Sequence, residues 1–247
     1  MNKILYSCIA EVKRAIRNPY YVLWSLLIPV CFYVIFTKVF TFNDNAADQA
    51  LWEAHYLMSM AAFSVMGSSV MTVGIRLVQD KQQGFITFLK VTPLPEYVYI
   101  ISQMVGQSVI HILSIVVIFF AGALLNDVSL TAMQWVLSGV WILFGSLVFL
   151  ALGTLVGTMN KVETASGVSN ILFLGLALLG GMWMPLNAMP TLFQDIATWL
   201  PSYHYANGPW EIIRGNSPAW NNIFMLIVFL CLFMVLSVYI RRKQEGL

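Results

Sequence analysis

Residues 97–126 read YVYIISQMVGQSVIHILSIVVIFFAGALLN, a run of 30 positions without Asp, Glu, Lys or Arg. A helix needs about 20 apolar residues to cross the hydrocarbon core of a bilayer, so this run is long enough to span a membrane. Five other uncharged runs reach about that length: residues 19–37, 54–75, 128–160, 164–194 and 215–240. None alternates strictly, and all exceed the roughly 10 residues of a barrel strand. The sequence therefore predicts membrane helices.

The composition supports the same class of protein. Of the 247 residues, 59% are hydrophobic and 10% are charged, whereas a soluble domain carries about 25% charged residues. A soluble enzyme is therefore excluded, and so is a disordered chain, because the apolar surface is ample. The net charge of +2 is too small for the basic stripe of a nucleic-acid-binding domain. We predict an all-α integral membrane protein with one transmembrane domain, residues 1–247.

Six transmembrane helices fit into the uncharged runs. We place them near residues 20–40, 54–76, 99–125, 132–158, 165–183 and 221–240. The longest runs exceed one crossing, so part of each must be tilted, interfacial or outside the bilayer.

The distribution of positive charge predicts the orientation. Cytoplasmic loops carry an excess of Lys and Arg. With six spans, 11 of the 13 cations lie at the two termini or in the connections after spans 2 and 4, and Lys38 and Arg214 remain for the other side. We therefore expect a multi-pass protein of the cell membrane with both termini in the cytoplasm.

Residues 2–18 are too charged to span a bilayer, yet they are periodic. At 100° per residue the apolar side chains from Ile4 to Ile16 fall on one face, and Lys3, Lys13 and Arg17 lie opposite. This pattern predicts an interfacial helix. The alternative is a generic positively charged anchor for the first span.

Residues that would carry chemistry are few. The sequence has no GxxxxGK[ST] phosphate loop and no HExxH, GxSxG or GxGxxG motif, and its three cysteines form no CxxC pair. The interiors of the predicted spans contain His111 and no other acid or base, which argues against a proton relay. We therefore predict no catalytic, cofactor-binding or metal-binding residue on this chain.

The connection between spans 2 and 3 is not an ordinary loop. Gly84 can start a short amphipathic helix, and Pro93 and Pro95 stop it. Its apolar residues are Phe85, Ile86, Phe88 and Leu89. Because charged residues flank this apolar turn, a partner protein could bind it; the alternative is a helix that rests on the membrane surface.

Residues 184–215, after span 5, are too rich in proline for one span and too aromatic for a solvated loop. We predict short re-entrant helices in the outer leaflet, with Trp and Tyr at the level of the headgroups. An adaptable outer gate would be formed by Met182, Trp183, Met184, Pro185, Met189 and Pro190. The alternatives are a passive outer cap and lipid-facing side chains.

Two motifs in these segments resemble the membrane subunits of type-2 ABC transporters, a family of bacterial drug, antibiotic and polysaccharide exporters. The loop pattern G-T-L-E-R-L-x-x-T-P is matched at Gly84, Ile86, Leu89, Thr92 and Pro93, while Thr87 and Phe88 replace its Glu and Arg. The pattern after span 5 is matched at Pro185, Met189, Pro190, Leu200, Pro201, Tyr203 and Arg214. With the order of the spans, the resemblance covers essentially the whole chain.

The resemblance implies a half-transporter. Such a subunit pairs with a second membrane subunit, identical or different, and with two copies of a separate ATPase that binds ATP and Mg. It implies that residues 84–90 are the coupling helix that contacts the ATPase, and that residues 2–18 are the connecting helix beside it. The transport path would lie at the two-fold interface.

Two polar stripes are candidates for that path. Gln103, Gln107 and His111 repeat along span 3, and Ser64, Ser68 and Thr72 repeat along span 2. Asn170, near the start of span 5, could line the dimer axis. Polar stripes on membrane helices avoid lipid, but hydrogen bonding between helices is their commoner use.

A mostly apolar path favours a hydrophobic or amphipathic cargo. We therefore predict efflux of an antibiotic, a drug or a peptide, with antibiotic resistance as one outcome. Export of a polysaccharide or a lipid-linked compound, a non-transporting scaffold or sensor subunit, and a secondary carrier that works alone are the alternatives.

Overall fold

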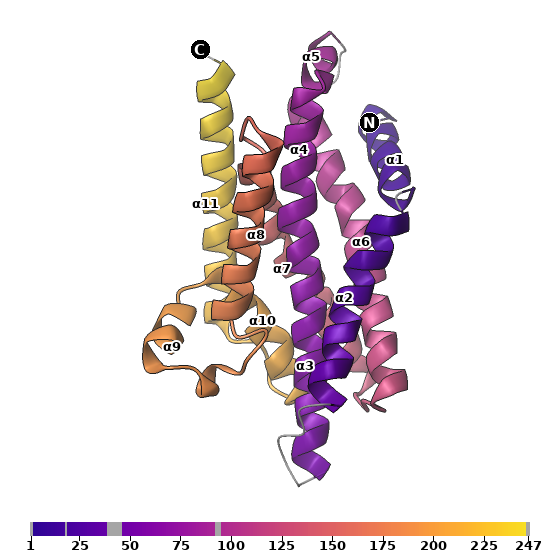
Figure 1. The fold of residues 1–247 in the computed structure, drawn as a ribbon, viewed down its shortest axis with the longest axis vertical. Helices are drawn as coiled ribbons and strands as arrows, with labels where there is room; N and C mark the ends of the chain where they lie inside the picture. Colours follow the sequence, from indigo (N-terminus) through magenta and orange to yellow (C-terminus); the bar gives the residue numbers. More distant parts are fainter. Residues whose placement is uncertain (1, 18, 39–45, 92–94, 246–247) are drawn as a thin grey trace.

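The computed structural model describes residues 2–17, 19–38, 46–91 and 95–245, and the regular elements within these ranges are all helices. The long helices run side by side in one elongated bundle (Figure 1). In chain order the elements are α1 (Asn2–Ile16), α2 (Pro19–Lys38), α3 (Ala46–Gly67), η1 (Ser68–Thr72), α4 (Val73–Gln82), α5 (Phe85–Lys90), α6 (Glu96–Leu125), α7 (Ala132–Val156), α8 (Val162–Leu179), η2 (Leu186–Ala188), α9 (Thr191–Ala197), α10 (Pro201–Ile213) and α11 (Trp220–Glu245).

Five helical stretches of the described chain are long and apolar enough to cross a membrane. They are Asp48–Gln82, Tyr97–Leu125, Ala132–Val156, Val162–Leu179 and Trp220–Gln244. Helix α2 adds a shorter apolar stretch, Ser25–Lys38, at the position of the first predicted span. The all-helical class is thus confirmed, and the sixth crossing, by α2, stays a prediction.

The helix that contains the second predicted span, residues 54–76, extends beyond that span at both ends. Helices α3, η1 and α4 follow one another without a break from Ala46 to Gln82. The helix therefore includes Asp48 and Glu53 at one end and Asp80 at the other. A helix can continue past the hydrocarbon core, where charged side chains reach water or partners, so charge marks the edge of the membrane and not the end of the helix.

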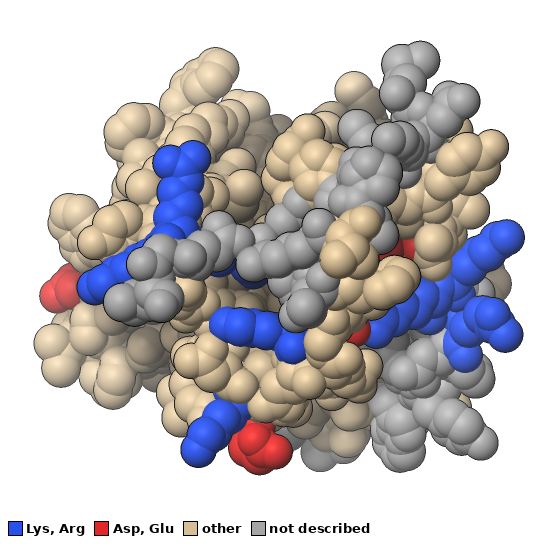
Figure 2. All heavy atoms as spheres, turned by 90° about the horizontal axis from the view of Figure 1, so that it is seen from above, with Lys and Arg blue, Asp and Glu red and all other residues tan. Residues whose placement is uncertain are grey.

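The bundle has two distinct ends. Both termini and α5 lie at one end, which we call the α5 end, and α9 and α10 lie toward the other (Figure 1). Seen from the α5 end, Lys and Arg are much more prominent than Asp and Glu on the surface (Figure 2). The clustering of cations with the termini matches the predicted charge asymmetry.

Helix α3 lies at the centre of the main hydrophobic core. Its Leu57, Met58 and Met60 are fully buried, and Phe149 of α7 and Tyr205 of α10 belong to the same cluster. One polar contact across helices in this core is the hydrogen bond that Trp210 Nε1 donates to Ser59 Oγ at 2.9 Å.

The segment η1 interrupts the long helix with a π-helical turn. The Ser69 hydroxyl donates to the Val65 carbonyl at 2.7 Å, and α7 packs closely against this turn at Gly153. A methyl group on Gly153 would lie 2.5 Å from the Ser69 carbonyl oxygen. Gly157, at the C-terminal cap of α7, is also closely packed, because a methyl group there would lie 2.6 Å from Leu77 Cδ1. Single π turns often mark functional sites.

The contact at Gly153 gives a prediction about stability. We expect Gly153→Ala to destabilise the protein by about 1–3 kcal/mol, because the new methyl group meets backbone that cannot rotate away. The control is Gly175→Ala in α8, where a methyl group meets nothing within 4 Å, and helix propensity favours alanine. Thermal unfolding in detergent should separate the two variants. Equal midpoints would contradict the close contact.

Short helices fill the predicted segment 184–215 at the end opposite α5. Helix α10 is held by polar contacts: the buried His204 pairs its Nδ1 with Asn222 Oδ1 at 2.8 Å and its Nε2 with the Thr198 carbonyl at 2.9 Å. Trp199 and Trp220 are 72% and 84% exposed, as expected for rings at headgroup level. The depth of this segment in the bilayer stays a prediction.

Candidate functional site

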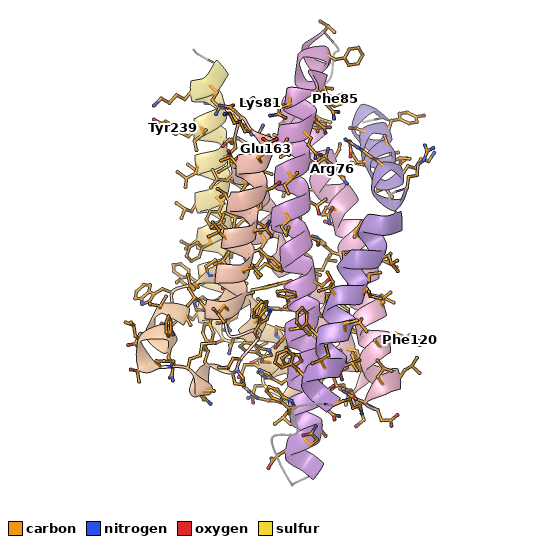
Figure 3. The ribbon with its side chains drawn as sticks, in the orientation of Figure 1. Arg76, Lys81, Phe85, Phe120, Glu163 and Tyr239 are labelled. Carbon is orange, nitrogen blue, oxygen red and sulfur yellow. The ribbon has the colours of Figure 1, made fainter. Side chains whose placement is uncertain are left out.

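Helix α5 lies at the extremity of the bundle, directly after the long α3–η1–α4 helix (Figure 3). Gly84 separates α4 from α5 and adopts a left-handed conformation with φ 77°, which glycine reaches without steric cost. Leu89 is 7% exposed and packs with Val73, Leu77, Tyr99 and Leu150. Its burial holds α5 against the bundle.

The side of α5 opposite Leu89 is exposed. Phe88 is 63% exposed, and Phe85 is partly exposed with its ring centroid 5.4 Å from that of Tyr99. Ile86 belongs to the same helix. Thr92 and Pro93, which complete the sequence motif, lie outside the described residues. The exposed ring of Phe88 therefore lies on a short helix that Leu89 holds against the bundle. An aromatic ring held in this way is suited to contact another protein.

A network of charged and polar side chains joins α1 to α4 and α6. The Arg14 guanidinium donates to both Asp80 carboxylate oxygens, at 2.8 and 3.0 Å. The Tyr99 hydroxyl and the Gln103 amide also donate to Asp80, the amide at 3.4 Å. Asp80 is 3% exposed. Because three helices, α1, α4 and α6, come together near α5, this network couples the N-terminal helix to the turn that carries α5.

Glu11 and Arg76 extend this network toward the bundle. Arg76, on the side of α4 that faces α1 (Figure 3), lies 4.0 Å from Glu11, and Arg14 lies 3.7 Å from Glu11. Burial raises the pKa of Glu11, while the two arginines partly offset that increase. The pKa of Arg14 is raised by its hydrogen bonds to Asp80. Helix α1 approaches α6 closely at Gly106, where a methyl group would lie 3.0 Å from Glu11 Cβ.

A cavity of about 1200 Å³ opens between α1, α2, the α3–η1–α4 helix and α8. Its cationic residues are Lys13, Arg14, Arg17 and Arg76. Its aromatic residues are Phe32, Phe63, Phe173 and Trp183. Hydroxyl-bearing residues lie between these groups along the long helix. The cavity thus changes from basic to apolar along its length, and the π turn lies in its wall.

The two predicted polar stripes have different surroundings. Ser64, Ser68 and Thr72 line the cavity. Gln103, Gln107 and His111 are buried on α6 and do not line it. His111 Nε2 lies 3.2 Å from Ser69 Oγ, and Gln103 belongs to the Asp80 network. The α6 stripe therefore connects helices, while the α3–η1 stripe faces an open space.

The remaining predicted residues are dispersed. Asn170 is exposed on α8, and its amide donates to the Ser166 carbonyl at 3.0 Å. Of the six predicted gate residues, Trp183 lines the cavity, Met182 is buried in the core and Met184 is exposed. Pro185, Met189 and Pro190 lie around η2 and the start of α9. The structure does not gather these six residues into one constriction.

Sequence reasoning missed the Asp80 network and the aromatic wall of the cavity. Arg14 and Asp80 are separated by 66 positions, and no local pattern joins them. A partial signal exists, because Arg76 and Asp80 on one helix and Tyr99 and Gln103 on another are each four residues apart and so share a helix face. Among the described residues, no group of His, Cys, Asp or Glu could hold a metal ion.

Comparisons with known proteins agree with these features. Residues 45–239 match the family model described as "ABC-2 family transporter protein". The chain is also 59% identical to the protein named "Putative transport permease YvfS" of Bacillus subtilis (strain 168), over 246 residues that cover 100% of both chains. The family match includes the long α3–η1–α4 helix, α5 and α8, but not the cavity residues of α1 and α2. The chain therefore belongs to the ABC-2 family and is a membrane permease of that family.

Proposed function

We propose that this permease is the transmembrane subunit of an ATP-driven exporter that moves a hydrophobic or amphipathic compound, such as an antibiotic, a drug or a peptide, out of the cell. ATP and Mg bind to a separate ATPase, present in two copies, because this chain contains no phosphate loop. The observation that carries the proposal is the anchored helix α5 with Phe88 exposed, in a chain of this family.

The orientation follows from charge. The α5 end carries both termini and a surface rich in Lys and Arg (Figures 1 and 2), and such surfaces face the cytoplasm. In this orientation α5 projects toward a soluble ATPase. A push on α5 is transmitted along the continuous helix to η1, because a packed helix moves as a rigid element.

The cavity is the proposed route of the cargo. Its wall includes α8, whose Ile171, Leu174 and Leu178 are exposed, so a second membrane subunit can complete the enclosure. The pairing of two such subunits would place their cavities at a common axis. Whether the second subunit is identical or different does not alter this geometry.

A lipid-linked saccharide is the second candidate cargo. Four aromatic residues line the cavity, and aromatic faces can stack on sugar rings as well as on hydrocarbon. We favour the hydrophobic cargo because three of the four rings are Phe, which offers no hydrogen-bond donor.

Transport by inside-out membrane vesicles tests the proposed function. The vesicles contain the permease and the ABC ATPase of its host, and a panel of fluorescent antibiotics, amphiphilic dyes and lipid-linked sugars serves as probes. We expect MgATP to drive accumulation of at least one probe, with no loss when an ionophore removes the proton gradient. Accumulation that needs the gradient but not ATP would indicate a secondary carrier. No accumulation of any probe would indicate a scaffold, and either result would contradict the proposal.

A further inference from the structure

The cavity has a positively charged end whose charge is not fully neutralised. Arg14 and Arg76 share the carboxylates of Asp80 and Glu11. Lys13 and Arg17 also line the cavity and are exposed, and no ion pair is recorded for either among the described side chains. Two cations, Lys13 and Arg17, thus remain for a ligand at this end of the cavity.

The opposite end of the cavity suits hydrocarbon. The Trp183 ring lies 6.1 Å from that of Phe32 and 5.8 Å from that of Phe63, and Phe63 lies 4.6 Å from Phe173 (centroid distances). These rings form one continuous apolar wall. Burial of apolar groups against such a wall is favourable by roughly 0.8 kcal/mol per methylene.

The middle of the cavity offers little to a polar ligand. The Ser64 hydroxyl donates to the Ser25 carbonyl at 3.0 Å, and the Ser68 hydroxyl donates to the Val65 carbonyl at 3.0 Å. Both hydroxyl donors are therefore already used within the protein. A hydrocarbon chain can pass this region without leaving a buried donor unpaired.

The distance between the two ends slightly exceeds the depth of the hydrocarbon of one lipid leaflet. Phe63 and Arg76 are 13 residues apart on the continuous helix, which corresponds to about 20 Å at 1.5 Å per residue. The hydrocarbon core of a bilayer is about 30 Å thick. A headgroup at the cations would lie at the membrane surface, and its chain would reach past the midplane.

We propose that this cavity binds an amphiphile with an anionic headgroup, held by Lys13 and Arg17, and a hydrocarbon chain that lies against Phe63, Phe173 and Trp183. The amphiphile enters from the cytoplasmic leaflet. This inference rests on the proposed function in one respect, the cytoplasmic position of the α5 end, and it narrows the cargo class from amphipathic compounds to anionic ones.

Native mass spectrometry of the purified full chain tests this site without any ATPase. The probes are phosphatidylglycerol and phosphatidylcholine with identical acyl chains. We expect the wild-type protein to retain the anionic lipid roughly tenfold better, since each cation near a headgroup contributes about 1 kcal/mol. In the double variant Lys13→Gln and Arg17→Gln the preference should fall to about twofold or less.

Two matched controls locate the headgroup and the chain. The double variant Arg242→Gln and Lys243→Gln removes the same charge from exposed positions at the end of α11 and should keep the preference. Leu174→Trp narrows the cavity that Leu174 lines and should reduce retention of both lipids, whereas Ile171→Trp, on the same helix outside the lining, should not.

Three results would overturn the inference. They are equal retention of both lipids by the wild-type protein, equal loss in the two charge variants, and full retention by Leu174→Trp. A second copy of the chain that covers the cavity would produce the first of these results. Because the mass-spectrometry experiment contains no ATP, a negative result would not contradict ATP-driven transport. A negative result in the vesicle assay would likewise not contradict this lipid site.

Discussion

Phe88→Asp is expected to abolish transport and to weaken binding of the ATPase at least tenfold, while the permease remains folded in the membrane. The ring of Phe88 is 63% exposed at the tip of the anchored helix α5, so its replacement removes no core packing. A central aromatic residue in a protein interface contributes about 2 kcal/mol or more, which corresponds to roughly thirtyfold in affinity. Co-purification of the ATPase and vesicle transport are the two measurements.

Two controls separate the loss of the ring from other effects. Gln83→Asp adds the same charge at an exposed position just before Gly84 and should preserve transport. Phe88→Ala and Tyr239→Ala each remove an exposed aromatic ring, because Tyr239 is also 63% exposed at the α5 end but on α11 (Figure 3). We expect only Phe88→Ala to weaken transport, since only Phe88 lies on α5. Normal transport by Phe88→Asp would contradict the assignment of α5.

Asp80→Asn is expected to lower the stability of the protein by about 2 kcal/mol and to reduce transport. The carboxylate accepts hydrogen bonds from Arg14, Tyr99 and Gln103, and charge-assisted hydrogen bonds contribute about 1.5–3 kcal/mol each. Arg14 is 43% exposed, so water recovers part of its loss. A decrease of about 5 °C in the unfolding midpoint is the corresponding shift.

The control for Asp80 is the ion pair of Glu211 with Arg214, in which the Glu211 side chain is 25% exposed. Glu211 accepts from Arg214 at 2.9 Å at the far end of the bundle, and exposed pairs contribute about 0–1 kcal/mol. Glu211→Gln should therefore change the midpoint by less than about 2 °C. If both variants have the same midpoint, the Asp80 network does not hold α1 to the bundle.

Much of the helical architecture was predictable because membrane helices must be long and uncharged. The runs around residues 97–126 and 132–158 gave α6 and α7 to within a few residues. The helix itself continues beyond the predicted span end at residue 76, to Gln82, with Asp80 buried among tertiary partners. Such partners are contributed by distant segments, and a local charge count cannot detect them.

The site was predictable where one short segment determines it. The turn at Gly84 and the short apolar helix after it followed from the spacing of glycine, aromatic and proline residues, although the role of this helix in coupling stays a prediction. The cavity was not predictable, because Phe32, Phe63 and Phe173 come from three helices and their apolar side chains resemble those that face lipid. Serines at helical spacing could not be sorted into lining and packing residues without the positions of their neighbours.

Photo-crosslinking from position 88 tests the central claim, that this permease engages a separate ATPase through α5. In one variant a photoreactive benzoylphenylalanine replaces Phe88. In a second variant it replaces Trp199, which lies just after α9, toward the end of the bundle opposite α5, and is 72% exposed. We predict that illumination of native membranes joins the permease to a soluble ATP-binding subunit from position 88 and not from position 199. No such adduct from position 88, or an equal adduct from position 199, would contradict the account.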